Sequence, residues 1–245
     1  MQNISKPLPL ERAKNIRDLG GYKTETGLIT KSQSFLRGDA LHNLTRKDCG
    51  LLYDYGVRCV IDLRSFDETE REPDRLPHLY KEIEYVHIPI QDHIRVNRYS
   101  EEFPPSMWQL YCWLLDDSQA EFRTIFETIT GYPDSCVLFH CSGGKDRTGM
   151  TAMLLLKLAG VDDETVIQDY AYSEKAMADI FPLQVAQMEA RGLAVPPYVM
   201  QSPPDNMIKA LEHLYSVYHT VEDYLIRIGL SEEQIEAVRN KLIDN

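Results

Sequence analysis

The sequence predicts an α/β fold with a helical C-terminal portion. Short apolar runs at 57–63, 85–91 and 136–140 have the length and composition of strands. Stretches with helical periodicity stand between these runs, and the chain downstream of Gly160 is mostly helical in pattern. With 245 residues, of which 43% are hydrophobic, the chain can bury one good core, so we expect a single domain over residues 1–245.

The first part of the chain alternates helix and strand. A helix is predicted from Thr45, whose hydroxyl can cap the first turn, to Tyr55, and Gly56 ends it. A strand over 57–63 follows directly. The segment 67–77 is charged and contains two prolines, which indicates a surface loop.

Two apolar stripes at helical spacing follow, one within 106–115 and the other within 122–129. The first consists of Trp108, Tyr111, Cys112 and Leu115, and the second of Phe122, Ile125, Phe126 and Ile129. Such stripes are more typical of a core than of a ligand-binding surface, so we interpret both as core helices.

The C-terminal region contains clear helix boundaries. Asp162 can cap a helix that runs through Tyr170, and Ser231 with Gln234 forms a capping box for the last helix. Between these helices, two Pro-Pro pairs interrupt residues 188–207, which is typical of a connector.

The most informative stretch is 140–149, with the sequence His-Cys-Ser-Gly-Gly-Lys-Asp-Arg-Thr-Gly. It joins the strand at 136–140 to a predicted helix at 148–159. A strand that leads through a short loop into a helix directs the loop amides toward one point, beside the positive end of the helix dipole. Gly143 and Gly144 allow a tight turn and close approach of a ligand. Such a nest of amides suits the oxygens of a phosphoryl group.

Cys141 and Arg147 stand six positions apart in this loop. The planar guanidinium of Arg147 can bind two phosphoryl oxygens at once. The loop amides, the helix dipole, Arg147 and Lys145 all favour the thiolate form of Cys141 near neutral pH. A thiolate there can attack phosphorus and form a phosphocysteine that water hydrolyses, and this chemistry needs no metal or other cofactor.

Two rival types of loop fit these residues less well. A nucleotide-binding P-loop requires Ser or Thr after its lysine, but Asp146 follows Lys145. A rhodanese-type sulfur-transfer loop would not require Arg147. A buried structural cysteine is the remaining alternative, and the combination of Cys141 with Arg147 at a strand-to-helix junction favours catalysis over it.

This loop resembles the signature of cysteine-based tyrosine phosphatases, and more narrowly of the atypical bacterial and fungal members that also act on phosphoinositides. Further similarity lies at 15–22, 35–41, 60–65, 169–170 and 220–242. The resemblance implies a cysteine-phosphatase-like α/β fold with a central mixed sheet flanked by helices. It also implies activity on phosphotyrosine, sometimes on phosphoserine, phosphothreonine or phosphoinositides.

The same resemblance implies roles for the loop residues. Cys141 becomes the nucleophile and Arg147 the transition-state clamp, and the phosphate is bound by Ser142, Gly143, Gly144, Lys145, Asp146 and Arg147. Lys145 resembles the loops of inositol-lipid phosphatases, in which added positive charge favours multiply phosphorylated head groups. A helical lid or insertion around 163–210 is implied too, as the alternative to a plain connector.

Two aspartates are candidates for the general acid that protonates the leaving oxygen. Asp146 lies within the loop itself, and the resemblance favours it. Asp92 follows the predicted strand at 85–91, in a position similar to the acid loop of dual-specificity phosphatases, but it can equally be a turn residue. We predict Asp146 first and keep Asp92 as the second candidate.

Several other charged residues are interpreted as structural. We expect the ring of His140 to hold the loop in place rather than to act as a base. Three pairs are expected to be buried ion pairs: Asp62 with Arg64, Arg17 with Asp18, and Arg37 with Asp39.

The bulk composition limits the partners. A net charge of −12 argues against nucleic acid and against adsorption to anionic membranes. The five cysteines are odd in number and lack scaffold-like spacing, which indicates reduced thiols in the cytosol, and no Cys/His spacing suggests zinc. Cys136 is interpreted as a strand-core thiol, with an oxidation partner for Cys141 as the alternative.

The first seven residues lack the apolar centre of a signal peptide, and no apolar run of about 18 or more residues exists. We therefore expect a cytoplasmic protein without stable membrane insertion, although export without a signal peptide stays open. The predicted function is cysteine-dependent hydrolysis of phosphotyrosine. The alternatives are the same chemistry on phosphoinositides and a non-catalytic phosphoprotein-binding module, and the oligomeric state is not indicated.

Overall fold

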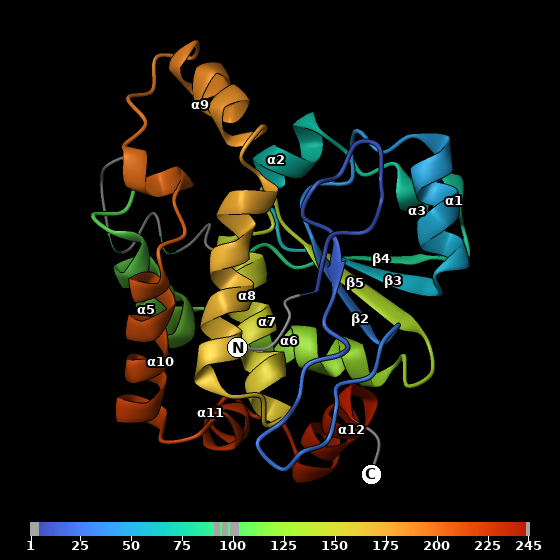
Figure 1. Ribbon diagram of the computed structural model, residues 1–245, viewed down its shortest axis with the longest axis vertical. Helices are drawn as coiled ribbons and strands as arrows, with labels where there is room; N and C mark the ends of the chain where they lie inside the picture. The colour runs from blue at the N-terminus through green and yellow to red at the C-terminus, as the bar shows by residue number, and fades with distance from the viewer. Residues whose placement is uncertain (1–4, 91–93, 95–97, 99–102, 244–245) are drawn as a thin grey trace.

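Strands from five separate parts of the chain form one mixed five-stranded sheet in the computed structural model (Figure 1), which describes residues 5–90, 94, 98 and 103–243. The strands are β1 (Arg17–Asp18), β2 (Phe35–Gly38), β3 (Val57–Asp62), β4 (Glu84–His87) and β5 (Cys136–His140), in the spatial order β1-β2-β5-β3-β4. β1 pairs antiparallel with β2, and every other pairing is parallel. The three predicted strands are confirmed, and the predicted mixed sheet is observed.

Helices cover both faces of this sheet. They are α1 (Arg46–Asp54), α2 (Phe66–Arg71), α3 (Leu76–Leu79), α5 (Met107–Asp117), α6 (Gln119–Thr130), α7 (Asp146–Leu158), α8 (Asp163–Ala176), α9 (Phe181–Glu189), α10 (Pro204–Tyr218), α11 (Val221–Arg227) and α12 (Glu232–Leu242), with a 3₁₀ turn η1 (Pro197–Met200). The predicted caps at Thr45, Asp162 and Ser231 are all confirmed. Within the part of the chain that the structure describes, no helix combines the length and apolarity needed to cross a bilayer.

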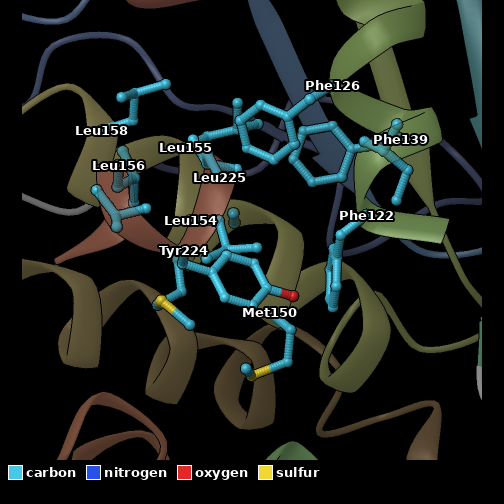
Figure 2. Packing of buried hydrophobic residues seen from close by; sticks show 14 of the residues in the cluster. Phe122, Phe126, Phe139, Met150, Leu154, Leu155, Leu156, Leu158, Tyr224 and Leu225 are labelled. Atoms are coloured by element: carbon cyan, nitrogen blue, oxygen red, sulfur yellow. The ribbon is translucent and has the colours of Figure 1, made fainter. Parts of the chain in front are cut away.

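Alternate residues of the central strands enter two different cores. Val137 and Phe139 of β5 join the larger core, which α5–α8 and α10–α12 cover, whereas Leu138 joins a smaller core under α1 and α3. Figure 1 shows α1 and α3 on one side of the sheet and the larger group of helices on the other. Figure 2 shows the larger core, where Phe139 lies near Phe122 and Phe126 of α6. The central strand is therefore buried on both faces, as its unbroken apolar run requires.

The prediction of a surface loop at 67–77 is wrong, because α2 and α3 occupy this segment. Ser65 and Glu68 form a capping box at the start of α2, in which each side chain accepts a hydrogen bond from the other residue's backbone N–H. Pro77 lies in the first turn of α3, where a missing N–H does no harm. Neither the charges nor the prolines excluded a helix.

The predicted stripe on α5 is partly wrong. Tyr111 and Leu115 are buried, but Trp108 and Cys112 are only half-buried, and Met107, Leu110 and Leu114 complete the buried face. The ring of Trp108 lies instead under the ammonium of Lys209 on α10, 4.8 Å from the ring centroid. The stripe on α6 is confirmed at all four positions.

The range 163–210 contains two kinds of structure. α8 packs on α7, and α10 packs between α5 and α8, so both of these helices belong to the core. Between them, α9 and η1 form a separate arm, with α9 at one end of the molecule in Figure 1. The middle part, 177–203, therefore differs from the two core helices that flank it.

Candidate active site

The loop that was predicted to bind phosphate follows β5 at the centre of the sheet. Gly38 of β2, His140 of β5 and Asp62 of β3 stand side by side in register at the carboxyl ends of their strands. This edge of a parallel sheet is where α/β proteins bind ligands. Cys141 is the first residue beyond it, and α7 begins at Asp146.

Gly144 is required by the turn of this loop. Its φ of +66° lies in the left-handed region, and a Cβ at this position would come within 2.6 Å of the Gly38 backbone. The loop therefore packs directly on the end of β2.

Three carbonyl oxygens of the loop are held from outside. Ser142 O accepts from Ala40 N at 3.2 Å, and Gly143 O accepts from Asn15 Nδ2 at 3.0 Å. Gly144 O accepts from Asn15 Nδ2 at 3.2 Å and from Arg37 Nη2 at 2.8 Å. In a trans peptide the N–H lies opposite the C=O, so the next three amides, those of residues 143, 144 and 145, point away from these anchors. This orientation is compatible with the predicted amide nest.

Cys141 and Arg147 line the same cavity, whose volume is about 750 Å³. Cys141 is 2% exposed, and the side chain of Arg147 is 12% exposed. The walls come from the loop, from α2, from Phe103 to Leu110 and from the arm formed by α9 and η1. The structure therefore brings the predicted nucleophile and the predicted clamp together at the floor of one cavity.

Glu68 of α2 is a functional residue that the sequence analysis missed. Its carboxylate accepts from both terminal nitrogens of Arg147, at 2.6 and 3.0 Å, and also from the hydroxyl of Ser142. Burial would raise the pKa of Glu68, but the guanidinium of Arg147 outweighs it and holds this pKa well below its usual range. The Ser-x-x-Glu pattern at 65–68 was the local signal, because it marks a helix start that faces the loop.

Asp146 lies in the first turn of α7 and lines the cavity. Its Oδ1 accepts from the hydroxyl of Tyr111 at 2.5 Å and lies 3.4 Å from the ammonium of Lys145. Asp146 and Cys141 therefore line the same cavity. The other candidate, Asp92, lies outside the described residues.

The ammonium of Lys145, expected to add positive charge for the phosphate, contacts the arm. The side chain is 2% exposed, and its ammonium donates to the carbonyl oxygens of Val199 at 2.5 Å and Gln201 at 2.8 Å. Lys145 therefore lines the cavity and also joins the loop to the arm.

His140 lies behind the loop in a buried ionic cluster. Its Nε2 lies 2.8 Å from Asp74 Oδ2, and its Nδ1 lies 3.2 Å from the carbonyl oxygen of Cys141. The predicted pair of Asp62 with Arg64 is confirmed, and Arg64 also binds Asp74. Asp62, Asp74 and His140 are close enough together to bind a metal ion, but Arg64 already occupies the space between the two carboxylates.

Protonation of His140 is expected to make stability pH-dependent. Burial disfavours its charge, but Asp74 and Asp62 outweigh burial and raise its pKa from 6.5 to about 9. The stabilisation is therefore complete below pH about 6.5 and disappears as the pH rises through about 9, by up to about 3 kcal/mol. Urea unfolding of wild type and His140→Gln should show a stability difference that shrinks as the pH rises from about 6 to about 10.

His213 provides the matched control for this measurement. It forms a 2.8 Å pair with Asp116 in a partly exposed position away from the loop. His213→Gln should keep the pH dependence of the wild type. A constant difference between wild type and His140→Gln over the whole pH range would contradict the prediction.

The predicted pairs of Arg17 with Asp18 and of Arg37 with Asp39 are wrong, because Asp169 of α8 binds both arginines. The carboxylate of Asp18 accepts instead from the backbone of Gly20 and Gln33, and that of Asp39 from the backbone of Lys14 and Asn15. These contacts tie α8 and the segment before β1 to the loop. Asp169 stands on the buried face of α8 together with Val166, Tyr170 and Ser173, and this spacing was the available signal.

Cys136 stands at the opposite end of β5 from Cys141, which is about 16 Å along an extended strand. That separation excludes a direct disulfide between them, and the strand-core interpretation of Cys136 is confirmed. All five cysteines are free thiols.

Known proteins provide an independent comparison. The model of a family described as "Tyrosine phosphatase family" matches residues 8–244. A tyrosine-protein phosphatase from Nostoc commune is 33% identical over 224 residues, which cover 86% of this chain and 74% of the relative. Among solved structures, TpbA of P. aeruginosa aligns with a TM-score of 0.43 and 13% identity, over 83% of this chain and 91% of that chain.

Proposed function

This chain belongs to the tyrosine phosphatase family, and on that premise we propose that it hydrolyses phosphotyrosine through a phosphocysteine formed on Cys141. One observation carries the proposal: Cys141 and Arg147 line the same cavity, on a loop whose amides point away from the groups that anchor its carbonyls. Three N–H donors and a guanidinium match the three equatorial oxygens of a phosphoryl group. Gly143, Gly144 and Lys145 then bind phosphate through their backbone N–H groups, and Ser142 contributes the carbonyl half of the first of these peptides.

The reaction takes two steps in this geometry. The Cys141 thiolate attacks phosphorus in line, so the S–P bond forms while the P–O bond to the tyrosyl group breaks, and Asp146 gives its proton to the departing oxygen. Water then attacks phosphorus and passes a proton to the Asp146 carboxylate, and the S–P bond breaks. Inorganic phosphate leaves and Cys141 is a thiolate again. Arg147, held by Glu68, stabilises the charge on the phosphoryl oxygens in both steps.

Trapping the intermediate tests the proposal directly. The purified protein should hydrolyse an aryl phosphate, and acid quenching during turnover should leave one phosphoryl group on the peptide that contains Cys141, detected by mass spectrometry. Turnover without such an adduct would point to direct attack by water. Tight binding of a phosphotyrosine peptide without release of phosphate would support the binding-module alternative instead.

Asp146→Asn is expected to lower kcat by about 10²–10³-fold and to remove the basic limb of the pH profile. An amide has no proton to give to the leaving oxygen, and a general acid works only while it is protonated. The measurement is kcat against pH for phosphotyrosine. Asp92→Asn serves as the matched control and should keep the basic limb, whereas loss of that limb in Asp92→Asn alone would transfer the role to Asp92.

A phosphoinositide is the second candidate substrate, by the same chemistry. The observation that favours it is the lining of the cavity, where Arg71 of α2 and Arg191 beyond α9 add positive charge around the loop. Comparison of kcat/KM for phosphotyrosine, phosphoserine and phosphothreonine peptides and for soluble phosphoinositides separates dual specificity from lipid specificity. We expect the phosphotyrosine peptide to have the highest value.

We further propose that residues 1–245 act as one catalytic domain in which the arm at 177–203 is the lid. Phe181 supports this, because its ring packs against Gly143. A Cβ added to Gly143 would lie only 3.1 Å from that ring, which is closer than an ordinary packing contact. The nucleophile must stay a free thiolate, so a reducing compartment such as the cytoplasm is the setting in which the site works.

A further inference from the structure

A directed chain of hydrogen bonds runs from the core to Asp146. Tyr111 of α5 donates to Asp146 Oδ1 at 2.5 Å, and the hydroxyls of Tyr111 and Tyr170 lie 2.7 Å apart. Asn206 of α10 reaches Tyr170 through its Nδ2 at 3.2 Å. Three helices therefore contribute one side chain each to a line that ends on a single carboxylate oxygen.

The hydrogens can be assigned along this line by counting donors. A tyrosine hydroxyl carries one hydrogen, and an ionised carboxylate can only accept. Since Tyr111 gives its hydrogen to Asp146, Tyr170 must donate to Tyr111. The amide of Asn206 can then donate to Tyr170. Every donor in the chain points toward Asp146.

The chain leaves the two oxygens of Asp146 unequal. Among the described residues, the hydrogen bond and the ion pair that Asp146 forms both involve Oδ1, and none involves Oδ2. When Asp146 is protonated, Tyr111 still donates to Oδ1, so the acidic proton resides on Oδ2. Asp146 lines the cavity beside Cys141, where a leaving oxygen would lie.

We propose that Tyr111 is a positioning residue for the proton donor: it fixes Asp146 through Oδ1 and reserves Oδ2 for the proton that the leaving group receives. This inference rests on the proposed function, in which Asp146 is the general acid.

Packing makes the arrangement rigid. Tyr111 is fully buried and Tyr170 is 1% exposed, and their rings meet edge to face at 5.7 Å. Burial, followed by the charge of Asp146, raises the pKa of Tyr111 well above 10, so its hydroxyl keeps its hydrogen near neutral pH. The ring is held in place by its packing against Tyr170.

Other charged groups around Asp146 come from every neighbouring segment, and the pH dependence reflects all of them. They are Lys145, Arg147 and Cys141 of the loop and α7, Tyr111 of α5, Tyr170 and Glu174 of α8, Glu68 of α2 through Arg147, and Arg191 in the same cavity. Substitution of Tyr111 leaves all the other groups in place, so a change in the pH profile reports on its hydrogen bond.

Tyr111→Phe tests the proposal, because it removes the hydroxyl and keeps the ring. The basic limb of kcat should move to higher pH, because the variant removes the hydrogen bond to Oδ1 of Asp146. With an alkyl phosphate, whose leaving group needs the proton, kcat should fall about 10-fold, whereas with p-nitrophenyl phosphate it should change little. A purely structural role of Tyr111 would lower both rates equally and leave the limb in place.

A stronger hydrogen-bond donor at position 111 should move the basic limb of kcat in the opposite direction. 3-Fluorotyrosine in place of Tyr111 is a stronger donor of the same shape, and the basic limb should then move to lower pH. This variant also keeps the test decisive if Tyr111→Phe does not fold. Tyr215→Phe is the matched control, because Tyr215 donates to Asp163 at 2.6 Å, away from the cavity, and the variant should keep the profile of the wild type.

The possible results distinguish the proposed role of Tyr111 from the proposed role of Asp146 as the general acid. An unmoved limb in both Tyr111 variants, together with loss of the limb in Asp146→Asn, overturns the role of Tyr111 and leaves Asp146 as the acid. A limb that persists in Asp146→Asn overturns the assignment of the acid itself. Opposite shifts in the two Tyr111 variants support the proposal.

Discussion

Replacing Cys141 with serine is expected to reduce kcat by about 10⁴-fold or more. A serine hydroxyl is far less acidic than a thiol, so a base would have to remove its proton before it could attack phosphorus. The neighbouring imidazole is not free for this, because the ring of His140 is engaged with Asp74 on one side and with the carbonyl oxygen of residue 141 on the other. The substitution therefore removes the thiolate nucleophile, and His140 cannot activate the serine hydroxyl that replaces it.

The measurement is turnover of phosphotyrosine peptide and of an aryl phosphate, together with binding of the peptide by calorimetry. Binding should persist in Cys141→Ser, since the loop amides and Arg147 remain. Cys112→Ser is the matched control, because Cys112 is a half-buried thiol on α5 and should leave kcat unchanged. Turnover of Cys141→Ser at the rate of the wild type would remove the basis of the proposed mechanism.

Arg147→Lys is expected to have the second largest effect, a fall in kcat/KM of about 10²–10³-fold. Lysine keeps the positive charge, but it has one nitrogen where Arg147 has a planar set of donors. Glu68 accepts from both terminal nitrogens of Arg147, and a single ammonium cannot reproduce this two-nitrogen contact together with a two-point contact to a phosphoryl group. Most of the loss should appear in kcat, because the charge on the phosphoryl oxygens is redistributed in the transition state.

The kinetic constants of Arg147→Lys should be compared with those of Arg239→Lys. Arg239 forms a similar network with Glu222 and Glu236 on the surface of the C-terminal helices, so it controls for the exchange of arginine with lysine next to glutamate. We expect its kcat/KM to stay within about 2-fold of the wild type. A change in KM alone for Arg147→Lys would indicate that the guanidinium binds substrate but does not stabilise the transition state.

Features that depend on neighbouring residues were predicted well. The apolar run at 136–140 became β5, the capping residues Thr45, Asp162 and Ser231 mark real helix starts, and the glycines of the loop take the turn expected of them. Each of these depends on backbone conformation within a few residues, which the local sequence specifies. The error at 67–77 has the same explanation, since the capping box at its start was a local signal that charge and proline obscured.

Features that depend on distant residues were not predicted. Arg17 cannot pair with Asp18 within a strand, because successive side chains point to opposite faces, and its partner Asp169 lies 152 residues away. Glu68 reaches Arg147 across 79 residues, and Tyr111 reaches Asp146 across 35. No local pattern marks such partners, since the topology of the sheet and the packing of α5, α8 and α10 decide which side chains meet.

The sequence alone determined the chemistry: a cysteine and an arginine on one strand-to-helix loop, with glycines that permit the turn. Only the tertiary structure decided how that loop is held, with Asn15 and Arg37 behind it, Glu68 on the arginine and Tyr111 on the aspartate. The physical reason is the range of the interactions. Backbone conformation and capping act within a few residues, whereas buried charges and hydroxyls are satisfied by whichever groups the completed fold brings next to them.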